Sequence, residues 1–433
     1  MTIHRVSQQL ARSVSRTPCI SVLPSVVKSE TMIQARQHFP GLDDKTFLDA
    51  ACVSLAPRPA IEAIEKFLDL TMVCPLESST HHHIFMDEMR AAARPSCAAL
   101  IGAREDEIAL VESTTHGLTV AANALPLEPG DRVLLSDLEF LQVAVPWTQK
   151  KKDGIEIDVV PNHQGEVRVE DFAARITPRT RVITISTVQW SNGYRVDMAA
   201  FSRLCRERCI WLVVDAIQQL GAIPLSVQQT PVDILVCGGH KWLNSPFGCG
   251  FLYINRDSQP RMRPPIAGYL DIEDPAGGWG EYFQTPTITP VRDYRYVSTA
   301  RRFETGGTAN YPGAIGLAAS LRMIQELGAD KIEAHIRGLT DSLLKGLDGL
   351  GVDVVTPRAP QNRSGIITFT VGTAQQNVAL MTRLQERKIL VSVRYTSGVG
   401  GVRVSCHFYN SLEDIDRLLG AVEELTSQRD VCK

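Results

Sequence analysis

Four patterns that would assign this chain to a familiar functional class are missing from its sequence. The ten cysteines include no C-x-x-C pair, which argues against a zinc site or a disulfide framework. No G-x-G-x-x-G opens a helix after a strand and no G-x-x-x-x-G-K-[ST] occurs, so neither a dinucleotide fingerprint nor a P-loop is indicated. No apolar run approaches the roughly 20 residues of a membrane-spanning helix, so we expect no contact with a membrane.

An excess of charge of either sign is missing too. The chain has 45 basic and 48 acidic residues and a net charge of -3, which excludes the basic face that nucleic-acid binding needs. Residues 1–29 contain no acid, and their basic, serine-containing composition predicts a disordered extension over residues 1–30, with an organelle transit peptide as the open alternative. The scattered cysteines indicate reduced thiols, and we expect a cytoplasmic protein.

Two groups of cysteines or histidines could suggest a metal site, but neither has the spacing that such a site requires. Cys205 and Cys209 lie four residues apart on a predicted helix, but no second pair accompanies them. The consecutive histidines His81, His82 and His83 cannot all face one site on a regular element, so we expect them to make contacts from a loop. The sequence therefore predicts no metal site.

Alternating strand and helix patterns are the main feature that is present. Seven short apolar runs after residue 106 are typical of buried strands: 107–112, 132–137, 155–160, 181–187, 210–215, 233–238 and 250–254. Strands that are apolar on both faces, with helical patterns between most of them, predict an α/β fold with a mainly parallel seven-stranded sheet covered on both sides.

The length of 433 residues is too great for one compact core and predicts two or three packed units. We expect residues 61–305 to form the large α/β domain and residues 306–433 a smaller α+β domain that starts with two helices, over 311–328 and 331–351. The segment 31–60 is expected to pack with the smaller domain.

Polar residues follow the predicted strands, at the edge of an open α/β sheet where ligands bind. Thr114 and Thr115 lie at the predicted start of a helix. Hydroxyl groups and free backbone N–H groups at a helix start form either a phosphate-binding site or a simple helix cap. Phe140 follows the next strand and could cover an aromatic ligand or belong to the core. Each of these residues alone is ambiguous.

An acid and a lysine at the ends of two later predicted strands indicate which kind of chemistry the site could support. Asp215 ends a very apolar strand, where a carboxylate is costly unless it is paired, and Gln218 follows three residues later. Lys241 comes after the next strand, beside His240, and a desolvated lysine near other cations becomes a nucleophilic amine. An acid for a pyridinium and a lysine for an aldehyde together fit pyridoxal 5'-phosphate (PLP) as the cofactor.

Seven segments in order resemble the class V aminotransferase superfamily of fold type I PLP enzymes, which contains isopenicillin N epimerases and cysteine desulfurases. The resemblance covers about residues 45 to 415 and is carried by FLDAACVSLAPRP, STTHGLTVAAN, LEFLQVAVPW, VVDAIQQLGAIPL, GGHKW, RRFETGGTANYPGAIGL and VRVSCHFYN.

The resemblance implies a PLP-binding large domain and roles for the residues above. It implies that Lys241 forms the Schiff base, that Asp215 keeps the pyridine nitrogen protonated and that Gln218 contacts the phenolic oxygen. Thr114, Thr115 and His240 resemble phosphate ligands, and Phe140 and Gln189 are expected as further cofactor contacts.

Substrate and partner contacts are implied in the same way. Arg403 resembles the arginine that binds the substrate α-carboxylate, with Arg394 as the second candidate and a surface ion pair as the alternative for Arg403. Trp190 is expected in the substrate pocket. Thr308 resembles the threonine that reaches the phosphate of the neighbouring subunit, which implies a homodimer with shared active sites.

The expected function is chemistry at the Cα–H of an amino acid, with Lys241 as general base. Two departures from the desulfurase pattern matter: Phe140 replaces a histidine over the cofactor, and the loop 395–401 (YTSGVGG) contains no thiol. We therefore expect an epimerase or a β-eliminating C–S lyase and not a persulfide-forming desulfurase. An aminotransferase and a non-catalytic PLP-binding scaffold remain alternatives.

Overall fold

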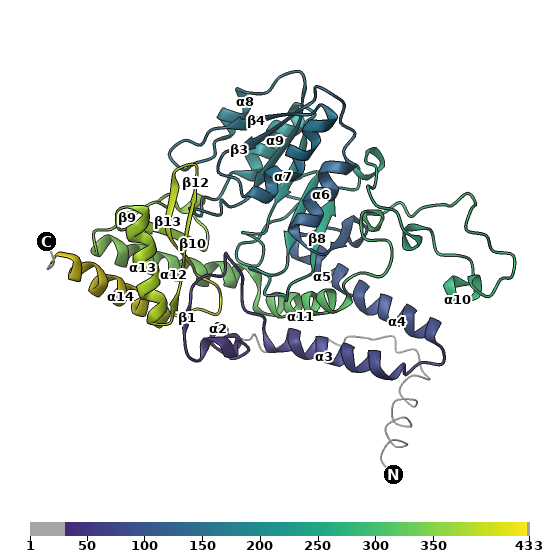
Figure 1. The fold of residues 1–433 in the computed structure, drawn as a ribbon, viewed down its shortest axis with the longest axis horizontal. Helices are drawn as coiled ribbons and strands as arrows, with labels where there is room; N and C mark the ends of the chain where they lie inside the picture. The colour runs from purple at the N-terminus through teal and green to yellow at the C-terminus, as the bar shows by residue number, and fades with distance from the viewer. Residues whose placement is uncertain (1–30, 431–433) are drawn as a thin grey trace, which may run out of the picture. The chain divides into compact units, whose positions relative to one another are not determined.

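The computed structural model describes residues 31–430 (Figure 1). The predicted extension or targeting segment over residues 1–30 lies outside the described residues. Within the described part, no helix is both long enough and apolar enough to cross a bilayer.

The predicted seven-stranded sheet is confirmed, with strand order β2-β8-β7-β6-β5-β3-β4. Its strands are β2 (Ile108–Val111), β3 (Arg132–Ser136), β4 (Glu156–Val160), β5 (Thr180–Ser186), β6 (Trp211–Asp215), β7 (Ile234–Gly238) and β8 (Gly250–Ile254). Only β8 runs antiparallel to its neighbours β2 and β7. The strand β4 departs from the expectation of burial on both faces, because it is an edge strand and is partly exposed.

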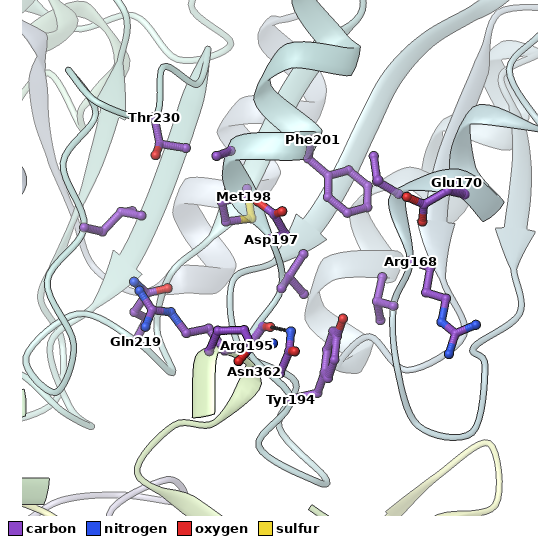
Figure 2. A pocket seen from close by; sticks show the side chains of 16 residues that line it. Arg168, Glu170, Tyr194, Arg195, Asp197, Met198, Phe201, Gln219, Thr230 and Asn362 are labelled. Carbon is purple, nitrogen blue, oxygen red and sulfur yellow. Dashed lines mark hydrogen bonds between the residues drawn. The ribbon is translucent and has the colours of Figure 1, made fainter. Parts of the chain in front are cut away.

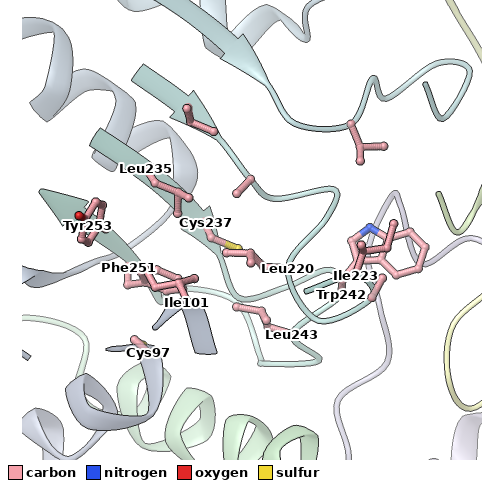
Figure 3. Packing of buried hydrophobic residues seen from close by; sticks show 14 of the residues in the cluster. Cys97, Ile101, Leu220, Ile223, Leu235, Cys237, Trp242, Leu243, Phe251 and Tyr253 are labelled. Carbon is pink, nitrogen blue, oxygen red and sulfur yellow. The ribbon is translucent and has the colours of Figure 1, made fainter. Parts of the chain in front are cut away.

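Helices cover both faces of this sheet (Figure 1). Successive strand residues alternate between two cores: Leu134 and Leu235 belong to one, Val133 and Val236 to the other. Figure 3 shows the first core, in which Cys237 and Phe251 of the sheet lie near Ile101 of α5. The second core is closed by α6 and α7.

The described helices have the following bounds: α2 Met32–Arg36, α3 Arg58–Val73, α4 Ser79–Ala91, α5 Ala93–Ile101, α6 Thr114–Ala124, α7 Leu141–Lys150, α8 Val169–Ala173, α9 Met198–Glu207, α10 Gly278–Tyr282, α11 Tyr311–Leu327, α12 Ala329–Gly349, α13 Ala374–Glu386 and α14 Leu412–Asp430. The two helices predicted over 311–328 and 331–351 are α11 and α12.

The C-terminal part contains a second, antiparallel sheet with strand order β12-β13-β10-β9. Its strands are β9 (Asp353–Val354), β10 (Ile366–Thr370), β12 (Ser392–Thr396) and β13 (Val399–Ser405). The short strand β1 (Thr46–Phe47) pairs in parallel with β11 (Ile389–Leu390), which ties residues 46 to 48 to this part of the chain. The exact domain boundaries remain a prediction.

One local expectation is wrong. The three consecutive histidines lie in helix α4 and not in a loop, because Ser78 caps the helix by accepting a hydrogen bond from the backbone N–H of His81. Among the described residues, no group of three or more His, Cys, Asp and Glu side chains is arranged to hold a metal ion.

Candidate functional site

The sheet brings the residues that follow its strands to one edge. Ser186 at the end of β5 is in register with Asp215 at the end of β6, and Asp215 is in register with Val236 of β7. Lys241 follows β7 by three residues. Sequence positions spread over more than 50 residues are therefore adjacent at the carboxyl ends of parallel strands.

Asp215 is buried there, Lys241 is partly buried, and the two groups influence each other. Burial lowers the pKa of Lys241 to about 8, although the Asp215 charge opposes that shift. Burial also raises the pKa of Asp215 to about 6, opposed by a hydrogen bond from the Ile217 N–H (2.9 Å) and by Lys241. A lysine with this pKa carries an appreciable fraction of free amine near neutral pH, as a nucleophile or base requires.

One aromatic ring lies beside Lys241, and a second ring packs against the first. The Lys241 Nζ atom is 5.7 Å from the centroid of the Phe140 ring, and Phe140 meets Trp190 edge-on with 5.2 Å between ring centroids. Phe140 is 40% exposed although it is a large apolar residue at the N-cap of α7. An exposed ring face above a reactive lysine is a suitable surface for a flat aromatic ligand.

Glu139 is a site residue that the sequence reasoning missed. Its carboxylate accepts hydrogen bonds from the Ser186 N–H (2.9 Å), the Ser186 hydroxyl and Gln189 Nε2 (3.0 Å). Burial raises the pKa of Glu139 to about 7, and the nearby Asp215 charge adds to that shift. The sequence did contain a signal for Glu139, because this residue follows a predicted strand and directly precedes Phe140.

The structure places the predicted phosphate ligands around the start of α6. Thr114 is buried and its hydroxyl accepts a hydrogen bond from the Gly238 N–H (3.0 Å), while Thr115 is exposed in the first turn. Burial, with the Lys241 charge, lowers the pKa of His240 to about 4, so its imidazole is neutral at pH 7 and keeps one N–H donor. Helix N–H groups and neutral donors of this kind suit an anion.

Gln218 links this edge to the N-terminal segment. Its Nε2 donates to the carbonyl of Ala51 (3.0 Å) and its Oε1 accepts from the indole N–H of Trp242 (2.8 Å). One of the two amide N–H groups is therefore left for a ligand oxygen. The Ser54 N–H also donates to the His240 carbonyl (2.9 Å), so residues 51 to 54 lie against the site.

The two candidate arginines come from adjacent strands of the second sheet. Arg403 on β13 is only 1% exposed; it donates to the Trp190 carbonyl (2.9 Å) and to Asp49 (3.1 Å), and burial lowers its pKa. Arg394 on β12 is half-buried, and its Nη2 lies 3.4 Å from the Cys52 Sγ atom. Asp49 and Cys52 were not singled out from the sequence, although both lie within the quoted segment FLDAACVSLAPRP.

Thr308 is not brought to these residues within one chain. It is exposed in the segment between Phe303 and α11, and among the described contacts no hydrogen bond joins it to the site. A role across a subunit boundary therefore remains a prediction.

The residues present fit PLP. A partly buried lysine lies within electrostatic range of a buried acid, a neutral histidine and a helix start lie beside them, and an exposed phenyl ring lies near the lysine. Gln189 Oε1 and Trp190 Nε1 are buried and have no hydrogen-bond partner among the described residues, which leaves polar capacity for a ligand.

Another cavity lies elsewhere and is lined by none of the predicted site residues. It is a surface cavity of about 610 Å³ between α8, α9 and residues 361–362 (Figure 2). Arg168 and Tyr194 are among its lining residues, and no lysine lines it. The candidate cofactor site is therefore the set of strand ends around Lys241 and not this cavity.

Comparison with known proteins gives the same family. The model for aminotransferase class V matches residues 46–418. A probable cysteine desulfurase of Pyrococcus abyssi is 28% identical over 90% of this chain and 96% of its own length. The isopenicillin N epimerase of Streptomyces clavuligerus is 30% identical over 78% of this chain and 84% of its own length.

A solved structure supports the cofactor assignment. A C-DES mutant with glycine covalently linked to its PLP cofactor superposes with a TM-score of 0.79 at 26% identity, over 90% of this chain and 98% of that chain. The predicted fold type and the predicted cofactor are thereby confirmed.

The predicted reaction is wrong in excluding persulfide-forming chemistry. Relatives that align over nine-tenths of this chain include cysteine desulfurases. The prediction relied on the thiol-free loop 395–401, yet the structure brings an exposed cysteine, Cys52, into the site from the opposite end of the chain. The loop alone therefore could not decide the reaction.

Proposed function

Because the chain belongs to the aminotransferase class-V family of PLP enzymes, we propose that it is a cysteine desulfurase. The reaction transfers the sulfur of L-cysteine to an acceptor thiol: L-cysteine and R–SH give L-alanine and R–S–SH. No external oxidant is required, since the electron pair of the broken Cβ–S bond stays on Cβ, which is then protonated. The supporting observation is the partly buried Lys241 near the buried Asp215, with two arginines of the second sheet and a thiol close to them.

Bound PLP supplies an electron sink that stabilises negative charge on the substrate carbon atoms. In this proposal the Lys241 Nζ atom holds the cofactor in the resting enzyme, then takes the proton from Cα and delivers a proton to Cβ. Its pKa of about 8 suits both directions of transfer near neutral pH.

The other residues orient the reactants. Asp215, with a pKa of about 6, is largely ionised at pH 7 and would hold bound PLP by accepting a hydrogen bond from its pyridine N–H. Phe140 would exclude water from one side of the cofactor site. The substrate carboxylate binds between Arg394 and Arg403, whose Nε atom is buried without a partner among the described residues.

The quaternary structure belongs to the same proposal. We infer a homodimer in which Thr308, exposed in its own chain, contacts the phosphate bound by the neighbouring subunit. All eight described cysteines are free, which supports the reducing conditions of the cytoplasm.

Product analysis tests the proposed reaction. The PLP-loaded protein and its Lys241→Ala variant are incubated with L-cysteine and dithiothreitol, and the products are identified by mass spectrometry. We expect alanine and sulfide in equal amounts from the parent protein and neither from the variant. Pyruvate with ammonia, or recovered cysteine of inverted configuration, would contradict the proposal; D-cysteine serves as the matched control substrate.

A further inference from the structure

Cys52 lies at a tight turn that crosses the candidate site. Its backbone N–H donates to the Asp49 carbonyl (3.0 Å), and the Asp49 side chain is held by Ser392 (2.8 Å) and Arg403 (3.1 Å). The preceding carbonyl, of Ala51, accepts a hydrogen bond from Gln218. One end of the turn is therefore fixed to the second sheet, through β12 and β13. The other end is fixed to Gln218 at the candidate cofactor site.

Three cationic side chains surround this thiol. Arg394 Nη2 is 3.4 Å from Sγ, and both Lys241 and Arg403 lie within electrostatic range of it. Arg403 is 1% exposed, and its Nε atom is buried with no partner among the described residues. An unpaired buried donor beside a thiol and two further cations forms a site for an anionic group.

Accessibility separates Cys52 from the other thiols near the site. Cys237, within charge range of Lys241, is buried in the first core (Figure 3). Cys249 is buried as well. Cys74 and Cys209 are exposed, but no recorded contact links them to site residues. Among the described cysteines, Cys52 alone combines exposure with a contact to a candidate substrate-binding arginine.

We propose that Cys52 is the acceptor that takes the sulfur from the substrate as an enzyme-bound persulfide, an inference that rests on the proposed desulfurase function. The Cys52 thiolate attacks the substrate Sγ atom, the new S–S bond forms as the Cβ–S bond breaks, and the electron pair goes to Cβ. The resulting Cys52 persulfide anion accepts a charge-assisted hydrogen bond from Arg394.

The location of the acceptor also explains how the loop 395–401 can lack a thiol. The arginine that contacts Cys52 lies on β12, directly before that loop. An acceptor on the turn at residues 49–52 approaches the substrate from the N-terminal segment, on the side where the carboxylate-binding arginines lie.

A single-turnover experiment tests the inference. The PLP-loaded parent protein receives one equivalent of L-cysteine without any added thiol, and tryptic peptides are analysed under non-reducing conditions. We expect one added sulfur atom on the peptide that contains Cys52 and an equal amount of alanine. Cys52→Ala should give no alanine burst until dithiothreitol is added as an external acceptor, whereas Cys74→Ser and Cys209→Ser should behave as the parent.

A second measurement needs neither PLP nor turnover. The apoprotein is alkylated with iodoacetate or with neutral iodoacetamide, and the rate ratio of the two reagents is compared between Cys52 and Cys209. The surrounding cations should raise that ratio several-fold at Cys52, and Arg394→Gln should lower it.

The outcomes separate the inference from the function. Alanine formation with sulfur on another cysteine, or with free sulfide and unmodified Cys52, overturns the role of Cys52 and leaves the desulfurase function standing. An absence of alanine even with dithiothreitol overturns the desulfurase function and the role of Cys52 with it. Equal alkylation ratios at Cys52 and Cys209 contradict the anion site.

Discussion

The pH dependence of cofactor attachment follows from the burial of Lys241. An ordinary lysine has a pKa of 10.5, whereas burial lowers the pKa of Lys241 to about 8. At pH 7 roughly a tenth of the Lys241 side chains are then uncharged, against about one in three thousand for an ordinary lysine. Because only the uncharged amine reacts with the PLP aldehyde, attachment should accelerate with rising pH and level off above about pH 8.

The Asp215→Asn variant tests why the pKa of Lys241 is about 8. The Asp215 charge raises the pKa of Lys241, so its removal should shift the midpoint of the attachment rate to lower pH, by roughly one to three pH units. The direction is the discriminating result, because an effect of fold damage would expose Lys241 and shift the midpoint upward.

The assay uses apoprotein mixed with PLP across a pH series. Samples are quenched with borohydride, and the modified lysines are counted by peptide mass spectrometry, with the exposed Lys152 as internal reference. A midpoint near pH 10 in the parent protein, or an upward shift in Asp215→Asn, would refute the argument that desolvation activates Lys241.

Three further predictions concern stability and cofactor retention. Glu304→Gln leaves the buried Arg90 and the partly buried Arg94 without their common carboxylate and should lower the free energy of unfolding by about 3–5 kcal/mol in urea titrations; Asp348→Asn, which removes an exposed ion pair, should cost less than about 1 kcal/mol. Gly221→Ala should destabilise by about 1–3 kcal/mol, because φ is +97° and a Cβ atom would lie 2.1 Å from a backbone oxygen, whereas Gly338→Ala has free space and should be neutral or stabilising. Phe140→Ala should weaken PLP retention roughly twofold to tenfold, the value of one aromatic stacking contact, by equilibrium dialysis; retention equal to the parent would remove Phe140 from the cofactor site.

Features that depend on a local sequence pattern could be predicted from the sequence. The seven strands followed from apolar runs, and Lys241 and Asp215 followed from their positions at the ends of those runs. The parallel topology brings both groups to one edge of the sheet, so their proximity could be predicted without a structure.

Residues that act through distant contacts were not predictable in this way. The ion pair between Asp49 and Arg403 joins positions 354 apart, and the contact between Cys52 and Arg394 joins positions 342 apart. No periodicity or spacing encodes such pairs. Glu139 had a local signal that was overlooked, since a buried acid after a strand needs donors as much as Asp215 does.

The contact between Asp49 and Arg403 has a consequence for the order in which the molecule is completed during synthesis. All strands of the large sheet have left the ribosome once residue 254 is free, whereas β13 ends 151 residues later, at Ser405. At typical elongation rates of 5–20 residues per second this gap lasts on the order of ten seconds. During that interval the nascent chain already carries Lys241 and its strand-end partners, while Asp49 and Cys52 still lack both arginines. The lysine proposed to hold the cofactor is thus made well before the two arginines proposed to bind the substrate.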